Sequence, residues 1–302
     1  MIHDRTHQWK NIRTLRDFRR VCEFGQISSG LAIILIPISD KSLQRTERMT
    51  HEMMSKPVCA LGVMAKAPVA GAVKTRLVPP LTEHEAAEIN ICFLRDMVAN
   101  IASVTETEAA TGLIVYTPAG SESAFDAVLP KGFKLLAQRG ASLGERLCNA
   151  TDDLLSQGYN SVCLINSDSP TLPKSILIRA MELLASDGDR VVLGAAEDGG
   201  YYLIGLKHAH RNLFREIAWS TSDVLARTRE RAEGIDLPVE MLPSWYDVDD
   251  ADTLKQLCEE LFLYKSLNGS YLAPHTRAFL ESILKTEGPR RICPKLSNRL
   301  SI

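Results

Sequence analysis

A carboxylate at the end of an apolar run is the first residue in this sequence that suggests chemistry. Asp168 follows the run 161–167, which contains β-branched residues, and it precedes two prolines. Such a run predicts a buried parallel strand, and ligands of open α/β sheets bind at the carboxyl ends of these strands. A carboxylate there is suited to holding Mg²⁺ or Mn²⁺ on a phosphate. The alternative is a turn residue or a helix N-cap.

A second acidic segment, 245–250, reads Trp-Tyr-Asp-Val-Asp-Asp. Alternate residues of an extended chain point to the same side, so Asp247 and Asp249 share a face. Either could complete the metal shell with Asp168, and we favour Asp247, with Asp249 as the second candidate. Asp249 or Asp250 could instead cap the helix expected after them. The predicted metal ligands are therefore Asp168, Asp247 and Asp249, for Mg²⁺ or Mn²⁺.

A basic loop follows the first expected strand. It turns at Pro68 and Gly71 and carries Lys66, Lys74 and Arg76. Glycine allows a ligand to approach the backbone closely, and arginine offers a bidentate fork, so this loop could bind a diphosphate. Its spacing fits neither the P-loop pattern nor the dinucleotide-binding glycine pattern. The alternative is a solvated basic loop.

An acidic and glycine-rich turn, 197–200, precedes two tyrosines. Asp198 or Glu197 could bind sugar hydroxyls, or serve as the general base toward an acceptor hydroxyl. The glycines allow close approach of a ligand, and a plain Asp-Gly hairpin turn is the alternative. Tyr201 and the tyrosine after it alternate in direction, so at most one faces the site. Trp219 could line an acceptor pocket, although Trp is more often a core residue.

Four segments, taken in order, resemble one known family. They are Ala65-Lys-Ala-Pro-Val-Ala-Gly-Ala-Val-Lys-Thr-Arg-Leu77, Gln138-Arg-Gly140-x-Ser-Leu-Gly144-Glu-Arg146, Asn166-Ser-Asp168-Ser-Pro170 and Ala196-Glu-Asp198-Gly-Gly200-Tyr-Tyr-Leu-Ile-Gly205. Over 56–263 the sequence is similar to an uncharacterised bacterial family of GT-A-like nucleotide-diphospho-sugar transferases. The relatives of that family include the phospholactate and molybdenum-cofactor guanylyltransferases. The resemblance implies a three-layer α/β/α GT-A-like fold with a mostly parallel central sheet, and a nucleotide-activated substrate with Mg²⁺ or Mn²⁺.

By the same resemblance, the segment 138–146 helps to enclose the base and ribose of the nucleotide. A helix is expected to begin within this segment, and helix N-termini attract anions. Arg139 and Arg146 add to that field, although Arg146 could instead form a surface ion pair.

The motifs and the resemblance together define three groups of predicted site residues. The nucleotide-binding residues are Ala65, Lys66, Pro68, Gly71, Lys74, Arg76, Gln138, Gly140 and Arg146. The catalytic residues are Asp198, Lys74 and Arg76. The acceptor-binding residues are Glu197, Gly199, Gly200, Tyr201 and Trp219.

These residues predict a metal-dependent transferase that moves a glycosyl group from a nucleotide-sugar to a small-molecule acceptor. Lys74, Arg76 and the metal would stabilise charge on the departing diphosphate. Nucleotidyl transfer from a nucleoside triphosphate, releasing pyrophosphate, is the alternative, because Lys74-Thr-Arg-Leu77 also resembles the guanylyltransferases. The glycine-rich nucleotidyltransferase signature is missing after the first strand, which favours glycosyl transfer. A non-catalytic nucleotide-binding protein is the second alternative, but the acids and cations that it would be expected to lack are present.

Composition indicates a globular enzyme with no evident nucleic-acid partner. The formal net charge is −2, and seven cysteines are scattered without C-x-x-C spacing. With no secretory signal, this cysteine usage predicts the cytoplasm. The apolar stretch 31–38 is far shorter than the roughly 20 residues that span a bilayer, so no membrane span is expected. Nothing in the sequence indicates an oligomeric state.

Alternating strands and helices must position these residues. Strands are expected at 58–64, 112–116, 133–137, 161–168, 190–195, 201–206 and 237–242. A capping box at Thr82 and Glu85 begins the first helix, whose apolar face is Ala86, Ile89, Phe93, Met97 and Ile101. Further helices are expected at 143–158, 173–185, 208–217, 222–233 and 250–262. This alternation predicts a parallel sheet with helical crossovers.

The domain organisation has three expected parts. Residues 1–55 form an N-terminal extension that is poorly ordered or lies upstream of the true start at Met49, Met53 or Met54. A helix at 13–24 that docks on the domain is the alternative. Residues 56–285 form the transferase domain, and 286–302 form a flexible C-terminal tail.

Overall fold

The computed structural model describes residues 58–264 and 269–297. The chain divides into two units between Met53 and Met54, and all described residues belong to the second unit. The expected N-terminal extension, its alternative helix at 13–24 and the apolar stretch at 31–38 lie outside the described residues. No helix in the described ranges is long and apolar enough to cross a membrane.

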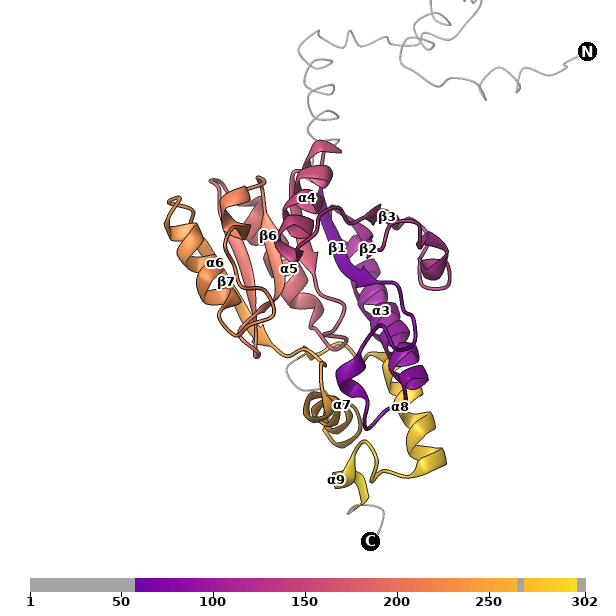
Figure 1. Cartoon of the computed structure of the whole chain (residues 1–302). Coiled ribbons are helices and arrows are strands. Elements are labelled where there is room, and N and C mark those ends of the chain that lie inside the picture. The colour runs from indigo at the N-terminus through magenta and orange to yellow at the C-terminus, as the bar shows by residue number, and fades with distance from the viewer. Residues whose placement is uncertain (1–57, 265–268, 298–302) are drawn as a thin grey trace, which may run out of the picture. The chain divides into compact units, whose positions relative to one another are not determined.

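A seven-stranded sheet forms the centre of the domain (Figure 1). Its order is β3-β2-β1-β4-β6-β5-β7, and β6 runs antiparallel to both of its neighbours. The carboxyl ends of β1 and β4 lead into the basic loop and into Asp168, and the two strands pair in parallel. The bounds are β1 Cys59–Lys66, β2 Ala110–Thr117, β3 Lys134–Ala137, β4 Ser161–Ile165, β5 Val191–Ala196, β6 Tyr201–Leu206 and β7 Val239–Trp245.

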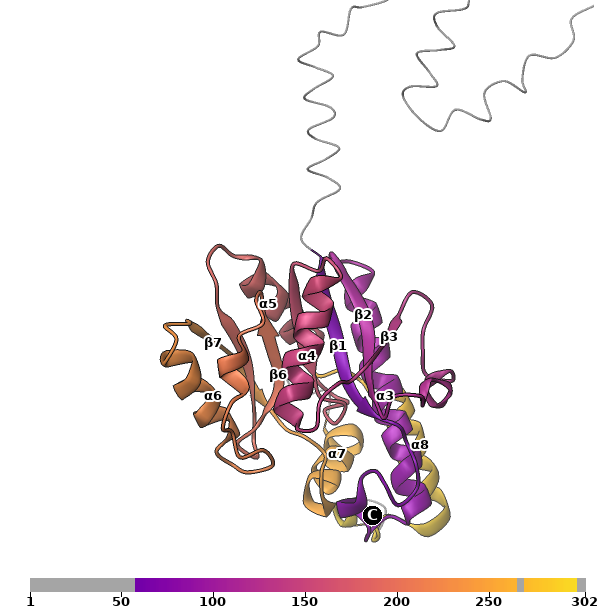
Figure 2. The same ribbon diagram turned by 45° about the horizontal axis from the view of Figure 1, so that its top comes forward.

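Helices cover both faces of the sheet. One face packs against α3 and α5, and the other packs against α4 and α6, with α4 in front of the sheet in Figure 2. The bounds are α3 Glu83–Thr105, α4 Leu143–Ser156, α5 Lys174–Ala185, α6 Val224–Glu233, α7 Ala251–Leu263, α8 Pro274–Glu287 and α9 Pro294–Ser297. Short 3-10 helices are η2 Thr75–Leu77, η3 Glu122–Phe125 and η4 Arg211–Phe214. The expected three-layer fold with a mostly parallel sheet is confirmed.

The first half of α3 also belongs to a separate apolar cluster with α7 and α8. The capping box at Thr82 and Glu85 is present, and the whole predicted apolar face of α3 is buried. Phe93 of this face lies in the same cluster with α7 and α8, and the ammonium of Lys74 stands over its ring. The periodicity of α3 thus places its start beside the candidate site.

Two expectations need correction. The helix expected at 208–217 is only the short η4, because Arg215 is extended and Glu216 adopts a left-handed conformation with φ 53°. The apolar residues of this segment, Leu213, Phe214 and Ile217, are buried, but the backbone does not continue as a helix. The flexible tail expected from residue 286 does not hold for 286–297, where Ile292 and Cys293 are buried in the cluster with α7 and α8. Residues 298–302 lie outside the described residues.

The start of α8 is capped by a carboxylate from α3. Asp96 is fully buried and accepts hydrogen bonds from the backbone N–H of His275 at 3.0 Å and of Thr276 at 2.8 Å. Asp96→Ala leaves both donors without this acceptor, so we expect the free energy of unfolding to fall by about 2–3 kcal/mol in urea titrations.

The exposed Glu88 on the same helix is the matched control. Glu88→Ala is expected to change the free energy of unfolding by less than about 0.5 kcal/mol. Equal effects of the two substitutions would contradict the capping role of Asp96.

Candidate active site

Five of the predicted residues line one cavity at the carboxyl edge of the sheet. The cavity has a volume of about 300 Å³ and receives side chains from the basic loop, α3, the loop after β4 and the loop after β7. The predicted residues on its wall are Lys66, Lys74, Arg76, Asp168 and Asp249. Asn90, Thr75 and Ser167 line it as well. The parallel pairing of β1 with β4 brings the basic loop and the Asp168 loop to the same edge.

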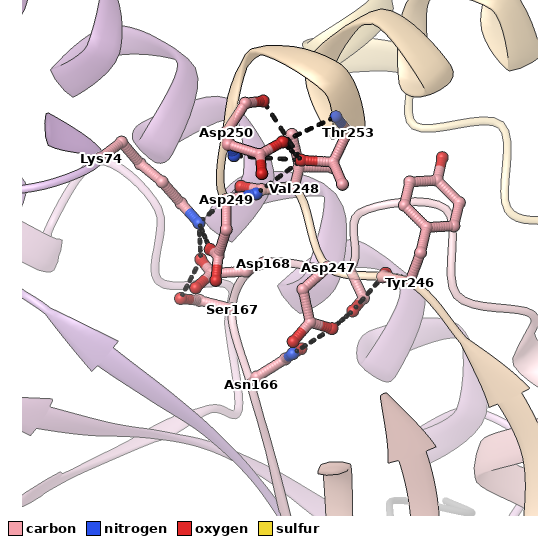
Figure 3. A network of polar contacts seen from close by, with 11 residues as sticks. Lys74, Asn166, Ser167, Asp168, Tyr246, Asp247, Val248, Asp249, Asp250 and Thr253 are labelled. Atoms are coloured by element: carbon pink, nitrogen blue, oxygen red, sulfur yellow. Dashed lines mark hydrogen bonds and ion pairs between the residues drawn. The ribbon is translucent and has the colours of Figure 1, made fainter. Parts of the chain in front are cut away.

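The ammonium group of Lys74 is the centre of the site (Figure 3). Its Nζ lies 2.9 Å from Asp168 Oδ1 and 2.8 Å from Asp249 Oδ1, and it donates to the Val248 carbonyl at 2.8 Å. The Lys74 side chain is 6% exposed and stands over the ring of Phe93, with Nζ 5.7 Å from the ring centroid. Burial alone would lower the pKa of Lys74, but Asp168 and Asp249 outweigh it and raise the pKa above its ordinary value.

The loops that carry the acids are tied together by a backbone hydrogen bond and by a bond from a serine side chain. The N–H of Val248 donates to the Asp168 carbonyl at 2.9 Å, and Ser169 Oγ donates to the Tyr246 carbonyl at 3.0 Å. The side chain of Asp250, rather than that of Asp249, caps α7 by accepting from the N–H groups of its first turn. Asp249 is therefore left to face the cavity.

Asp247 lies in the same loop after β7, and its side chain contacts the loop after β4. Its Oδ1 accepts from Asn166 Nδ2 at 2.9 Å and from Ser169 Oγ at 3.0 Å (Figure 3). Burial, and then the nearby Asp168 carboxylate, raise the pKa of Asp247 to about 7, against the smaller opposing effect of these two donors. Carboxylates are therefore crowded here beyond what the Lys74 ammonium neutralises.

The donor set fits a hard divalent cation. Asp198, Asp247 and Asp249 can each offer an oxygen, and these oxygens all lie within 4.8 Å of one another. The buried Oδ1 of Asn166 has no hydrogen-bond partner among the described residues and adds another oxygen close to Asp247. Mg²⁺ and Mn²⁺ prefer such oxygen ligands. Asp168, which the sequence also predicts as a metal ligand, pairs with Lys74 through Oδ1, as Asp249 does, and accepts from Ser167 Oγ.

The basic loop presents its other cations to solvent. Lys66 is exposed and donates to the Ala72 carbonyl at 2.9 Å, and Arg76 is exposed on η2. Gly71 has φ 74°, which favours glycine at this turn. Ala65 is buried in β1 and Pro68 is half-buried, so the side chains of both pack against the protein.

The segment 138–146 is held mainly by contacts within the protein. Gln138 Nε2 donates to the Val115 carbonyl at 2.7 Å, and Arg146 Nε donates to the Gly140 carbonyl at 3.2 Å. Arg139 pairs with Asp153 on α4. Gly140 has φ 127°, and a Cβ there would come 2.6 Å from the Glu145 side chain, so this glycine is required by the turn itself.

The acidic turn is the hairpin that joins β5 to β6. Gly200 N donates to Asp198 Oδ1 at 2.8 Å, while a Cβ on Gly199 would lie 2.1 Å from the Ser222 carbonyl oxygen. Gly199 is thus explained by its positive φ and by its contact with the residues before α6. Glu197 is exposed beside the exposed Asp198.

The aromatic residues predicted for the acceptor lie elsewhere. Tyr201 packs in the apolar cluster on the α4 and α6 face, and its hydroxyl is buried. Tyr202 is buried on the opposite face, as the expected alternation requires, and donates to the Pro243 carbonyl at 2.7 Å. Trp219 is half-buried over Gly144 at the start of α4. It lines a second cavity of about 390 Å³, together with Ser142, Glu145, Asn149, Arg211 and Arg215.

Sequence reasoning assigned no role to Asn166, Ser169 or Asn90. Asn166 and Ser169 hold Asp247, and their signal was their place in the polar run around Asp168. Asn90 is buried on α3 and lines the main cavity. The sequence feature that could have indicated it is its position as a polar residue directly beside the apolar face of the helix.

Comparison with known proteins finds a family model and a similar crystal structure. The family described as "Uncharacterized protein conserved in bacteria (DUF2064)" matches residues 100–221. A crystal structure from Desulfovibrio desulfuricans G20, provisionally named a nucleotide-diphospho-sugar transferase, is 31% identical, with a TM-score of 0.66. The match covers 76% of this chain and 96% of that one. No curated protein matches the chain.

More distant structures share only parts of the geometry. CMP:2-keto-3-deoxy-manno-octonic acid synthetase complexed with CTP is 11% identical, covers 66% of this chain and 96% of that one, and has a TM-score of 0.44. Rv0371c from Mycobacterium tuberculosis H37Rv, in complex with manganese, is 14% identical, covers 68% and 99%, and has a TM-score of 0.40. Similarities at this level carry no conclusion about the present chain.

The sheet, its helical layers and the extensive match define an α/β protein with the fold of the nucleotide-diphospho-sugar transferase from D. desulfuricans. The chain belongs to the DUF2064 family, a GT-A-like bacterial family, as the sequence motifs implied.

The ion pairs of Lys74 with Asp168 and Asp249 should contribute measurably to the free energy of unfolding. Lys74→Met leaves Asp168 and Asp249 facing each other without the ammonium, so we expect the free energy of unfolding in EDTA to fall by about 2–4 kcal/mol. Added Mn²⁺ should restore part of this loss, because it replaces the missing positive charge.

Lys66→Met is the matched control, because Lys66 is an exposed lysine of the same loop with one hydrogen bond to a carbonyl. Its expected effect is below about 1 kcal/mol. A Lys74→Met protein as stable as wild type in EDTA would contradict the central position of this ammonium.

Asp247 should make the metal-free protein less stable as pH rises. The pKa of Asp247 in the folded protein, about 7, lies above the ordinary value of 3.8, so its favourable contribution is present at low pH and is lost as pH rises to 7. Asp247→Asn keeps the acceptor oxygen but cannot ionise. We expect it to raise the free energy of unfolding at pH 8 in EDTA by about 1–3 kcal/mol, with a gain that shrinks toward pH 4.

Asp252→Asn, at an exposed position in the first turn of α7, is the control and should show little pH-dependent gain. A lower stability of Asp247→Asn at pH 8 in EDTA would show that Asp247 is not the strained carboxylate of the site.

Proposed function

We propose that the chain is a metal-dependent transferase that acts on a nucleotide-activated substrate and transfers a glycosyl group to a small acceptor. The observation that carries the proposal is a single cavity lined both by carboxylates, Asp168 and Asp249, and by two exposed cations, Lys66 and Arg76. A diphosphate bridged to a divalent cation needs both kinds of partner. The name of the D. desulfuricans relative supports the same class of substrate.

The chain's residues have separate tasks in this proposal. Lys66 and Arg76 bind the diphosphate, and the guanidinium of Arg76 can contact two phosphate oxygens at once. Asp198, Asp247 and Asp249 would hold Mg²⁺ or Mn²⁺, which supplies charge neutralisation to the diphosphate when bound. Lys74 fixes Asp168 and Asp249 and keeps both loops in position. The segment 138–146, through Gln138, Gly140 and Arg146, borders the nucleotide.

The acceptor is placed on the side of the β5–β6 turn. Asp198 and Glu197 are the exposed acids there, and Asp198 is close enough to Asp247 and Asp249 to act at the same centre. An acceptor hydroxyl held by Asp198 would have its proton taken up by that carboxylate. The cavity beside Trp219 provides an aromatic wall for a larger acceptor. Tyr201 has no part in this proposal, because its hydroxyl is buried.

Nucleotidyl transfer remains the second candidate. The observation in its favour is the segment Lys74-Thr-Arg-Leu77, which resembles the guanylyltransferases. The two reactions differ in the bond that breaks. Glycosyl transfer breaks the bond between the sugar and the diphosphate, whereas nucleotidyl transfer breaks a bond at the α-phosphorus and releases pyrophosphate.

Calorimetry of the full chain with UDP, GDP, CTP and GTP, with Mn²⁺ and with EDTA, tests the proposal. We expect Mn²⁺-dependent binding of one nucleoside diphosphate, and Arg76→Gln should weaken it by about tenfold, or about 1.4 kcal/mol. Arg229→Gln, on the exposed side of α6, is the matched control and should bind as wild type does. Asp247→Asn should remove the Mn²⁺ dependence.

Selective binding of a triphosphate, followed by pyrophosphate release, would select nucleotidyl transfer. Absence of nucleotide binding by the folded protein would exclude both reactions.

A further inference from the structure

A second group of metal-binding side chains lies away from the candidate active site. Asp189 precedes β5, and His208 and His210 follow β6. Because β6 runs antiparallel to β5, the start of β5 and the end of β6 meet at the amino edge of the parallel strands. The acids around Lys74 lie at the opposite, carboxyl edge. The two groups are therefore separate.

The strand register brings these three residues together. Val191 pairs with Leu206 at the end of the ladder, and the same register extended by two residues sets Asp189 opposite His208. Lys207 ties the two loops by donating to the carbonyls of Ser186 and Gly188, each at 2.8 Å. The segments that carry the three side chains are thus joined by the β5–β6 ladder and by the two hydrogen bonds of Lys207.

The side chains converge on one carboxylate. His210 Nε2 lies 2.7 Å from Asp189 Oδ2, and His208 Nδ1 lies 3.2 Å from Asp189 Oδ1. One ligand atom from each of the three residues lies within 4.8 Å of the other two. Tetrahedral zinc, with bonds of about 2.0–2.2 Å, needs its ligand atoms about 3.4 Å apart, so a small outward shift would make room for the ion.

We propose that Asp189, His208 and His210 bind Zn²⁺, or a similar transition-metal ion, and that the ion joins the start of β5 to the end of β6. Two imidazoles and one carboxylate form a ligand set that suits zinc, cobalt or nickel rather than Mg²⁺. His208 is 68% exposed, which gives an ion access from solvent and leaves a coordination position for water.

The neighbouring cations do not compete for the carboxylate. The Lys207 ammonium contacts backbone carbonyls, and the Arg190 guanidinium pairs with Glu240 at 3.6 Å. The Arg190 backbone N–H donates to Asp189 Oδ1 at 2.9 Å, which orients the carboxylate toward the histidines. Metal binding requires an unprotonated nitrogen on each imidazole, so an ion in this group would take the place of any proton between an imidazole and Asp189.

Calorimetric titration of the full chain with ZnCl₂ tests this site. Wild type should bind Zn²⁺ saturably, and the double variant His208→Ala, His210→Ala should bind it at least about tenfold more weakly. The matched control is Asp198→Asn, Asp247→Asn, which alters the acids at the other edge and should leave this zinc affinity unchanged. Asp189→Asn keeps the shape of the side chain and should also weaken binding.

Absorption of the Co²⁺-loaded protein identifies the ligands independently. Visible bands of tetrahedral Co²⁺ without a thiolate charge-transfer band are expected, and they should be lost in the histidine variant. Thermal unfolding should show a Zn²⁺-dependent rise in Tm for wild type and for the Asp198→Asn, Asp247→Asn control, but not for the histidine variant. Unchanged zinc affinity in the histidine variant, a thiolate band, or the absence of saturable binding up to about 100 μM would overturn the proposal.

Discussion

The buried ammonium of Lys74 is the interaction on which this site depends. It joins three loops that are far apart in the sequence, through Asp168, Val248 and Asp249. Burial favours the neutral amine, so without the carboxylates the pKa of a lysine that is 6% exposed would be lowered. The two acids raise the pKa of Lys74, and the positive charge of the ammonium in turn lies between the two carboxylates. The loops after β1, β4 and β7 therefore take their positions as one unit.

The same balance of charges supports the proposed cation. Four carboxylates gather at this edge, those of Asp168, Asp198, Asp247 and Asp249, and one buried ammonium cannot neutralise them all. The pKa of Asp247 rises to about 7 because this residue is buried beside the Asp168 carboxylate. In the proposed function a divalent cation relieves that repulsion, and the exposed Lys66 and Arg76, which line the same cavity as Asp168 and Asp249, bind the negative charge of a substrate. The crowding of carboxylates thus accounts both for the raised pKa of Asp247 in the metal-free protein and for the proposed binding of a divalent cation.

The sequence was sufficient for those parts that depend on periodicity and strand ends. The apolar face of α3, the alternation of Tyr201 and Tyr202, and the sheet edge shared by the basic loop and Asp168 all followed from spacing. The pairing of Lys74 with Asp168 and Asp249 did not follow, because contacts between loops more than ninety residues apart depend on side-chain reach. The helix expected at 208–217 failed because a left-handed Glu216 ends the turn despite the apolar spacing. The group of Asp189, His208 and His210 was invisible for a similar reason, since it needs the register of β5 and β6.

Anomalous diffraction from crystals grown with Mn²⁺ and a nucleoside diphosphate tests the central claim most directly. The account predicts a manganese peak within coordination distance of Asp198, Asp247 and Asp249, with the diphosphate between the metal and Arg76. Lys74 should remain paired with Asp168 below it. A manganese peak at other acids, or a diphosphate bound away from the loop that carries Lys66 and Arg76, would contradict the account.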